Sequence, residues 1–271
     1  MRPFLVIAVA ALLSASTDYK SAQEEWRRDY QASLLAPTGW LAVAGLFWLH
    51  NGENRIGSAP SNDIVLPKSA PASAGTITLH AGHVTAALPG HAGEVKLDEQ
   101  KLPLGRLTLM AVKRDKRYGI RLWDPDADSV RHFSGLHWYT VDANARIEAR
   151  WIPYDHPKQI PIVSILGYTE MNTAPGAAEF HWKGKLYRVE PVIEEDHLFL
   201  MFKDPTSRHE TYPSGRFLTV AMPRDGKVIL DFNQARNPPC AFTSFATCPI
   251  PPKQNFLDQP VLVGEKRYGH H

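Results

Sequence analysis

Short apolar runs separated by turn-forming residues fill most of the chain, and this pattern constrains the fold more strongly than any other feature. Runs such as 63–66, 84–88 and 118–123 are bounded by Gly, Pro, Asn or Asp. Short strands with turn signals at close intervals are typical of β sandwiches and barrels. The 22 prolines and 18 glycines among 271 residues also suit strands and turns better than long helices. We therefore predict a mostly β protein.

Several short segments have the chemistry of hairpin turns. Asn51-Gly52 is a strong hairpin signal, because both residues tolerate a positive φ. Lys183-Gly184 and Asp225-Gly226 each separate two alternating runs further along the chain. The acidic run 194–196 lies between two apolar runs, where we expect a solvated hairpin tip rather than a calcium site, which needs more oxygen ligands. These turns predict largely antiparallel sheets.

One amphipathic helix is expected near the N-terminus. The segment 21–24 has the form of a capping box, which marks the start of a helix. The predicted buried face carries large residues at intervals of four, Trp26, Tyr30 and Leu34. We expect this helix to span about 22–35 and to end before Pro37.

The prediction for the whole chain is a helix followed by two β units. The expected segments are a signal peptide over 1–16, a helical segment over 17–36, a small β-sandwich unit over 37–125 and a larger antiparallel sandwich or barrel over 126–271. A linker rich in Pro and Ser does not separate the two β units in the sequence. We therefore expect them to pack on each other.

The first 16 residues have the composition of a secretory signal. Arg2 gives a positive start, 3–13 is an apolar stretch, and 14–16 supplies the small residues that a signal peptidase recognises. The stretch is shorter than the roughly 20 apolar residues that cross a bilayer, so we expect no membrane span in the mature chain. The alternative is a buried N-terminal strand. We expect an exported protein, either periplasmic or secreted.

The chain has two cysteines, Cys240 and Cys248. The loop between them is short enough for a disulfide if the Cβ atoms come within the required few ångströms. An exported protein lies in an oxidising compartment, which favours such a bond. We expect a Cys240–Cys248 disulfide, with two separate buried thiols as the alternative.

The charge balance and the motif content exclude several function classes. Thirty basic residues against 28 acidic residues give a formal charge of +2, so the composition does not favour a nucleic-acid partner. The sequence has no phosphate-binding loop, no dinucleotide-binding glycine pattern, no Gly-x-Ser-x-Gly elbow and no zinc-binding spacing. We therefore expect no metal and no cofactor. The candidate partners are a small molecule, a glycan or an envelope protein.

The last third of the chain contains the most distinctive sequence. Four segments follow one another there: 211–218 (TYPSGRFL), 228–235 (VILDFNQA), 237–242 (NPPCAF) and 248–252 (CPIPP), with Asn255 and 264–266 (GEK) after them. Together they resemble the DUF1684 family, a domain of unknown function, and residues 40–66 are more loosely similar to the opening of that family. The resemblance implies a shared pattern and assigns no activity. Gln254 stands where we expect an acidic residue, which weakens any mechanism that needs a carboxylate there.

A second, shorter likeness lies at 52–66. This stretch is similar to the start of a forkhead-associated domain, a small β sandwich that binds phosphothreonine. In that family an Arg follows the Gly of the first motif, but here Ser58 follows Gly57. Without that guanidinium the bidentate contact with a phosphate lacks a donor. The likeness therefore implies the sandwich geometry and does not imply phosphopeptide binding.

Asp231 and Asn233 form the centre of the candidate site. They are two residues apart on an expected strand, so their side chains share one face. A buried carboxylate needs a partner, and Arg216 at the start of the neighbouring expected strand has a suitable guanidinium. We therefore expect a buried Arg216–Asp231 ion pair. The residues expected to line a ligand pocket are Tyr212, Arg216, Asp231, Asn233, Asn237 and Lys266.

The candidate site is compatible with two classes of function. In the first, the chain is an exported ligand-binding or structural module of the cell envelope, and the C-terminal motif forms a polar pocket or ties down the proline-rich coil. In the alternative, the chain is a hydrolase in which Asp231 acts as base or orienter while Arg216 and Lys266 stabilise negative charge. The sequence contains no recognisable nucleophile or cofactor signature and assigns no catalytic residue. We therefore expect the binding or structural module.

Overall fold

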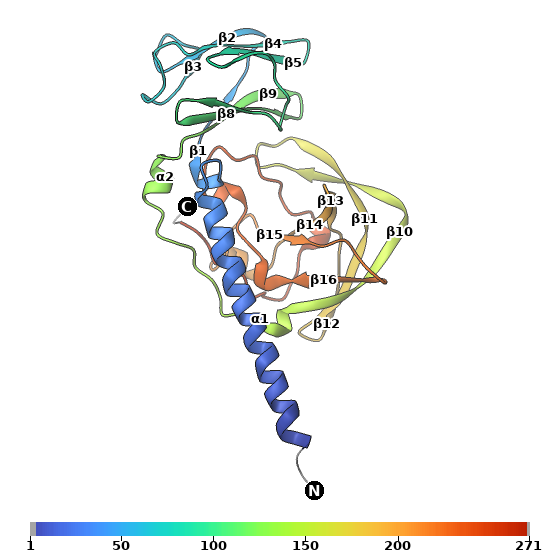
Figure 1. Cartoon of the computed structure of the whole chain (residues 1–271). Helices are drawn as coiled ribbons and strands as arrows, with labels where there is room; N and C mark the ends of the chain where they lie inside the picture. The colour runs from blue at the N-terminus through green and yellow to red at the C-terminus, as the bar shows by residue number, and fades with distance from the viewer. Residues whose placement is uncertain (1–3, 270–271) are drawn as a thin grey trace. The chain divides into compact units, whose positions relative to one another are not determined.

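The computed structural model describes residues 4–269, and for residues 4–17 it describes the backbone alone. The chain is mostly β with one long N-terminal helix (Figure 1). It divides into two compact units. Unit 1 comprises Met1–Ala32, Gly135–Phe242 and Thr247–His271, and unit 2 comprises Ser33–Ser134 and Thr243–Ala246.

Unit 2 contains two β sheets that share one apolar core. The first sheet has the strand order β1-β9-β8-β7 and the second the order β3-β2-β4-β5-β6. Their bounds are β1 (Val43–Trp48), β2 (Gly52–Gly57), β3 (Ile64–Val65), β4 (Gly75–His80), β5 (His83–Leu88), β6 (His91–Glu94), β7 (Lys101–Leu104), β8 (Leu107–Arg114) and β9 (Arg117–Trp123). Ile56 and Ile77 from one sheet and Leu109 and Leu122 from the other belong to the same buried cluster. Alternating burial along β5 is the strand period that the sequence predicts.

The turn predicted at Asn51-Gly52 does not form a hairpin. Gly52 has a positive φ of 97°, as the turn signal requires. However, β1 pairs with β9 while β2 pairs with β4, so the chain passes from one sheet to the other at this point. A turn signal specifies local backbone geometry and leaves the identity of the paired strand open.

Unit 1 also contains two sheets around one core. Their strand orders are β12-β11-β10-β16 and β13-β14-β15. The bounds are β10 (Arg146–Val163), β11 (Thr169–Trp182), β12 (Lys185–Val189), β13 (Val192–Glu194), β14 (His197–Phe202), β15 (Arg216–Val220) and β16 (Lys227–Asp231). Phe180 and Leu230 of the first sheet share a buried cluster with Leu200 and Leu218 of the second. Within residues 4–269, none of the sheets closes into a barrel.

Two of the predicted hairpin tips in unit 1 are confirmed. Lys183-Gly184 connects the paired strands β11 and β12, and both residues have a positive φ. The acidic run 194–196 connects β13 and β14. Asp225-Gly226 forms a turn before β16, but β15 and β16 belong to different sheets. This last difference changes the candidate site, as described below.

Short helical turns connect many of the strands. Their bounds are η1 (Trp40–Ala42), α2 (Asp128–Arg131), η2 (Ala143–Ala145), η3 (Pro205–Arg208), η4 (Phe232–Gln234), η5 (Pro239–Ala241) and η6 (Lys253–Asn255). Three of them lie in the C-terminal motif, where proline cannot donate the hydrogen bonds of a sheet. The chain after β16 is therefore held by caps and side chains.

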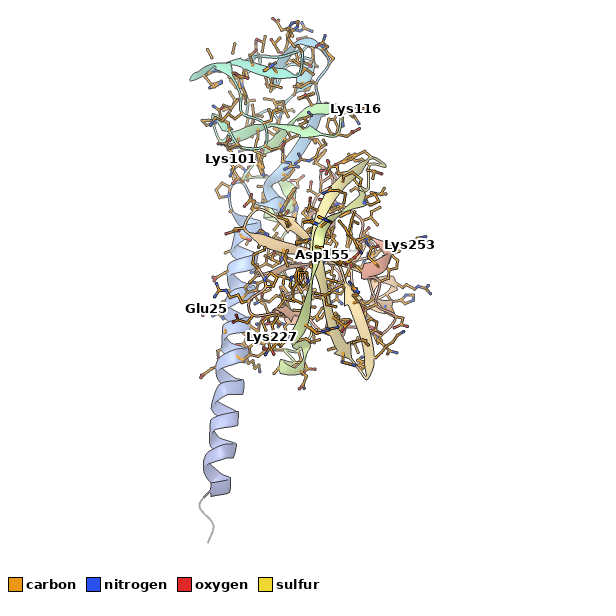
Figure 2. All side chains as sticks on the ribbon, turned by 90° about the vertical axis from the view of Figure 1, so that its right-hand side faces the viewer. Glu25, Lys101, Lys116, Asp155, Lys227 and Lys253 are labelled. Carbon is orange, nitrogen blue, oxygen red and sulfur yellow. The ribbon has the colours of Figure 1, made fainter. Side chains whose placement is uncertain are left out.

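The N-terminal helix α1 spans Phe4–Leu35 and begins earlier than predicted. The segment 21–24 lies inside the helix, so it does not cap its start. The predicted spacing of four does mark the packed face: Trp26 and Tyr30 stack at 5.6 Å, and Trp138 meets both rings edge-on. Glu25, labelled in Figure 2, is exposed. The amphipathic face therefore docks on unit 1 through its aromatic side chains.

The expected signal peptide, residues 1–16, lies outside the residues whose side chains the structure describes. Helix α1 includes the backbone of residues 4–16. Across the described part of the chain, no helix combines the length and the apolar character needed to cross a membrane.

Candidate functional site

Arg216 is completely buried and binds Asp204. Its Nη2 lies 3.2 Å from Asp204 Oδ1, and both side chains have 0% exposure. The guanidinium also donates to the carbonyl oxygens of Val261, at 2.8 Å, and Val263. Burial is the main cause that lowers the pKa of Arg216, while Asp204 opposes this effect. The ion pair therefore fastens the C-terminal segment to the core of unit 1.

The carboxylate of Asp204 has several further hydrogen bonds. Asp204 caps the short helix η3, and Thr206 donates its hydroxyl to Asp204 Oδ1 at 2.9 Å. The backbone N–H of Val261 donates to Asp204 Oδ2 at 2.8 Å. A buried ion pair is tolerated when such hydrogen bonds satisfy most of its remaining polar atoms. Both carboxylate oxygens are satisfied here, whereas Arg216 Nε has no hydrogen-bond partner among the described residues. This arrangement is a structural clamp with no group left for a ligand on the carboxylate side.

The predicted Arg216–Asp231 ion pair is wrong. Arg216 begins β15, which pairs with β14 and sets Arg216 opposite Phe202, two residues before Asp204. Asp231 ends β16, which pairs with β10 in the other sheet, where its partner is Arg146. Two strands that follow each other in sequence were expected to be neighbours in one sheet. Their separation into two sheets gives Arg216 and Asp231 different partners.

Gly215 explains how Arg216 reaches its position. Gly215 has a φ of 102°, and a Cβ on it would lie 2.5 Å from the carbonyl oxygen of Phe202. Only glycine allows this backbone conformation together with such a close approach. The Gly-Arg pair of the motif therefore lets β15 begin tightly against β14.

Asp231 binds the N-terminal helix. Tyr19 donates its hydroxyl at 2.8 Å, and Gln23 donates its Nε2 at 3.0 Å. Asn233 lies in η4 rather than on the strand, yet it donates Nδ2 to Asp231 Oδ1 at 3.1 Å, so the predicted proximity of Asp231 and Asn233 is found. Burial and the Asp231 carboxylate raise the pKa of Tyr19, which keeps the phenol protonated as a donor. Tyr19 and Gln23 were not predicted as site residues, although they lie on the helix face of Trp26, at a spacing of three or four residues.

Asn237 and Lys266 lie beside a buried carboxyl group, Glu265. The backbone N–H of Asn237 donates to Glu265 Oε2 at 2.7 Å, and Asn237 Nδ2 donates to the carbonyl of Lys266 at 2.8 Å. Glu265 has 0% exposure, and burial raises its pKa to about 7. Lys266 faces the other way, with its Nζ 4.7 Å from the centre of the Tyr139 ring. Adjacent residues of an extended segment therefore point to opposite sides, as expected.

Glu265 follows a segment in which burial alternates. Val261 and Val263 are buried, whereas Leu262 between them is 46% exposed. The alternation does not continue to Glu265, because Gly264 is buried as well and has a φ of 82°. The sequence predicts that the adjacent residues Glu265 and Lys266 face opposite ways, which favours solvent exposure of at least one of them over an acid–base pair. The structure buries Glu265.

Tyr212 lies beside the two cysteines. Its hydroxyl donates to the carbonyl oxygen of Cys240 at 3.0 Å. The expected disulfide is absent: the backbone N–H of Cys240 donates to Cys248 Sγ at 3.1 Å, and the two sulfur atoms are not bonded. The hydrogen bond from Cys248 is the largest cause that lowers the pKa of Cys240 to about 7. The two thiols are thus neighbours with unequal environments.

The expected pocket residues therefore do not converge on one partner. Arg216 binds Asp204, Asp231 binds the helix, Asn237 binds the segment 265–266, and Tyr212 binds Cys240. The hydrolase arrangement of Asp231 with Arg216 and Lys266 is not assembled. Among the described residues, no group of three or more His, Cys, Asp and Glu side chains is placed to hold a metal ion.

A polar cluster at the surface of unit 1 was missed by the sequence-based analysis. We call it the Tyr154 cluster; its members are Tyr154, Lys158, Arg188, Glu190 and Gln254. Lys158 Nζ lies 2.6 Å from Glu190 Oε1, and Gln254 Nε2 donates to Glu190 Oε2 at 3.1 Å. Tyr154 donates its hydroxyl to the same carboxylate, and Arg188 Nη2 lies 3.4 Å from the Tyr154 hydroxyl. Figure 2 labels Asp155 and Lys253, the sequence neighbours of Tyr154 and Gln254.

The buried motif residue Asn255 positions this cluster. Its Oδ1 accepts the backbone N–H of Glu190 at 2.8 Å, and its Nδ2 donates to the carbonyl of Glu190 at 3.2 Å. Burial by itself would raise the pKa of Glu190, but the hydrogen bonds from Lys158 and Tyr154 outweigh it and hold the pKa below its ordinary value. Gln254, the departure from the expected acidic residue, supplies a donor to this carboxylate. An acidic residue there would place a second carboxylate against Glu190.

A comparison with family models confirms the resemblance seen in the sequence. The model of the family described as "Protein of unknown function (DUF1684)" matches residues 131–266. None of the curated proteins matches the chain. Among solved structures, the chain is similar to the solution NMR structure of an uncharacterized protein of Haloarcula marismortui. The two are 27% identical, the match covers 53% of this chain and 82% of the other, and the TM-score is 0.43.

Proposed function

The chain belongs to the DUF1684 family, whose members share a sequence pattern without an assigned activity, and we propose that it is an exported, non-catalytic module of the cell envelope that binds a polar ligand at the Tyr154 cluster. The ligand class that fits best is a glycan. The N-terminal sequence supports export, because a positive residue, an apolar stretch and small residues follow one another there.

One observation carries the proposal, namely the division between buried and reachable polar side chains. The buried motif residues Arg216, Asn237 and Asn255 direct their side-chain hydrogen bonds to backbone groups of the chain itself and, in the case of Arg216, also to Asp204. The Tyr154 cluster is held by Asn255 and remains partly exposed: the side chain of Lys158 is 53% exposed and that of Glu190 is 12% exposed. Binding sites commonly place reachable polar groups on a rigid support.

The chemistry of the cluster suits hydroxyl groups. The Glu190 carboxylate accepts hydrogen bonds, while Lys158 and Gln254 donate them. The Tyr154 ring lies beneath Lys158, whose Nζ is 4.3 Å from the ring centre, and displacement of that ammonium by a ligand would free a flat surface. A sugar presents several hydroxyls and apolar C–H groups together, and it can replace the internal bonds of the cluster one by one.

The proposal is tested by titrating the full chain with soluble fragments of envelope polysaccharide and measuring the heat of binding. We expect saturable binding that weakens roughly tenfold or more in Glu190→Ala, since a buried hydrogen bond to a charged group contributes about 1.5–3 kcal/mol. Lys227→Ala is the matched control, because Lys227 (labelled in Figure 2) is an exposed lysine bound to Glu148 away from the cluster. Equal affinity in both variants would refute binding at this cluster.

Export is tested separately in cells that carry the native gene. We expect mass spectrometry to find a mature N-terminus after residue 16 in the exported fraction. A full-length chain retained inside the cell would contradict the export part of the proposal.

A further inference from the structure

The two cysteines are brought together at the base of a short loop. Cys240 lies in η5, directly after Pro238 and Pro239, and Cys248 is eight positions later. The prolines restrict the backbone φ before Cys240, which limits the conformations available to this segment. The Cys240 N–H donates a hydrogen bond of 3.1 Å to Cys248 Sγ, which holds the Cys248 sulfur next to Cys240. The fold thus places two thiols in contact without joining them.

The two thiols are not equivalent. Cys240 is partly exposed, whereas Cys248 is only 4% exposed. The Cys240 thiol also has a lowered pKa, about 7, because Cys248 and then Tyr212 hydrogen-bond to its sulfur. The thiolate is the nucleophilic form of cysteine, and attack on a dissolved reagent requires access.

We propose that Cys240 and Cys248 form a thiol–disulfide exchange site, in which Cys240 attacks a small-molecule disulfide and Cys248 completes the reaction. This inference rests on the geometry of the cysteine pair and Tyr212, and it goes beyond the proposed glycan binding. It also differs from a permanent structural disulfide, because it assigns an order of attack and a co-reactant class.

The reaction is balanced in two steps. The Cys240 thiolate attacks one sulfur of the reagent disulfide RSSR, forming a mixed disulfide Cys240–S–S–R and releasing RS⁻. Cys248 then loses its proton and attacks the sulfur of Cys240, forming the Cys240–Cys248 disulfide and releasing the second RS⁻. The two protein thiols are oxidised by two electrons, and RSSR is reduced to two thiols that take up the released protons.

Tyr212 is a positioning residue in this scheme. Its hydroxyl donates to the Cys240 carbonyl at 3.0 Å. The same proton can turn to the adjacent sulfur when the thiol ionises, which lowers the pKa of Cys240. Replacement by Phe removes the donor and keeps the ring. We therefore expect the pH midpoint of the Cys240 reaction to lie near 7 in the natural chain and to move upward in Tyr212→Phe.

The test uses the reduced full chain with oxidised glutathione, followed by intact-mass spectrometry after acid quenching. We expect the natural chain to lose two hydrogens, and Cys248→Ser to accumulate a mixed disulfide with one glutathione. We expect Cys240→Ser to react at least roughly tenfold more slowly at pH 7, because its remaining thiol is less exposed.

Three outcomes would overturn the proposal. The first is a natural chain that remains reduced while its urea-unfolded form is oxidised by the same reagent. The second is equal trapping of glutathione by the two serine variants, which would remove the order of attack. The third is an unchanged pH midpoint in Tyr212→Phe, provided that circular dichroism shows the variant to be folded. Glycan binding by the reduced chain is measured in parallel, so a failure of either proposal is seen separately.

Discussion

The two units differ in what they enclose. Unit 2 buries a large apolar cluster between its sheets, with Ile120 and Leu122 among its members. Unit 1 has an apolar core as well, but it also buries Arg216, Asp204 and Glu265. Unit 2 also buries charged groups. Its carboxylate Asp124 is paired with Arg106, whose side chain is 45% exposed, and its buried Arg121 lies over the rings of Trp40 and Trp123. In unit 1, the side chain of the corresponding carboxylate, Asp204, is completely buried.

This difference separates two sources of stability. Apolar burial is non-directional, does not depend on pH and tolerates modest changes of shape. An enclosed polar network is directional, and removing one member leaves another buried without its partner. In the C-terminal motif, buried polar side chains such as Arg216 and Asn237 depend on partners elsewhere in unit 1. We therefore expect unit 1 to be more sensitive than unit 2 to single polar substitutions and to pH.

The largest effect is expected for Arg216→Met. This change removes the guanidinium and leaves Asp204 as an unpaired buried charge, which costs about 3–5 kcal/mol. Local stability is measured by hydrogen exchange in urea, read on peptides of each unit, because two units need not unfold together. The protection of backbone amides from hydrogen exchange should fall in peptides of unit 1 and stay unchanged in peptides of unit 2.

The double variant Arg216→Met with Asp204→Leu sharpens this test. Removing both charges eliminates the uncompensated carboxylate, so part of the lost stability should return, while the Val261 N–H and Thr206 still lack their acceptor. If Arg216→Met alone lowered the stability of unit 1 by less than about 1 kcal/mol, the Arg216–Asp204 ion pair would contribute little to that stability.

The next largest effect concerns Glu265 and pH. Burial raises its pKa from 4.5 to about 7, so the folded state binds the proton more tightly than the unfolded state. The contribution to stability is complete below pH 4.5 and is lost as the pH rises to about 7. Glu265→Gln should remove this slope and stabilise unit 1 at pH 8 by a few kcal/mol.

The groups that face Glu265 include the Asn237 N–H and, at longer range, the charges of Arg236 and Arg216. The variant and the natural chain are compared by urea unfolding at pH 5 and pH 8. If the free energy of unfolding changed equally between pH 5 and pH 8 in Glu265→Gln and in the natural chain, this result would contradict a raised pKa of Glu265.

A smaller effect is expected for Tyr19→Phe. The phenol donates to the Asp231 carboxylate and accepts from Asn233 Nδ2 at 3.0 Å, so its loss should weaken helix docking by about 1.5–3 kcal/mol. Proteolysis within residues 18–31 under native conditions should become faster. Glu25→Gln, on the exposed side of α1, is the matched control and should leave the rate unchanged. Equal rates in the two variants would show that the Tyr19 bond does not hold the helix.

The smallest effect is expected for Arg106→Ala in unit 2. Arg106 is partly exposed, and Asp124 keeps the backbone N–H of Asp126 as a donor at 3.0 Å. Protection of unit 2 peptides should change far less than protection of unit 1 peptides does in Arg216→Met. A comparable loss would break the contrast between the two units.

Much of the fold could be predicted from local sequence. The period of two gives the strands, Lys183-Gly184 gives a tip with two positive φ angles, and the spacing of Trp26 and Tyr30 gives the docking face of α1. The start of α1 could not be placed, because the capping box at 21–24 is also compatible with a helix interior. The proximity of Asp231 and Asn233 was predicted because the two residues are neighbours in sequence.

The sequence by itself determined the β character, the positions of most turns, the packed side of the helix and the family, because each depends on residues a few positions apart. The tertiary structure alone decided which groups meet. Arg216 binds Val261, 45 positions away, and Tyr19 binds Asp231, 212 positions away. Such partners depend on which strands share a sheet, and the alternation of side chains along a strand is the same whichever neighbour it has. The charge on Arg216 therefore required a buried partner, and only the assignment of β15 and β16 to different sheets made that partner Asp204.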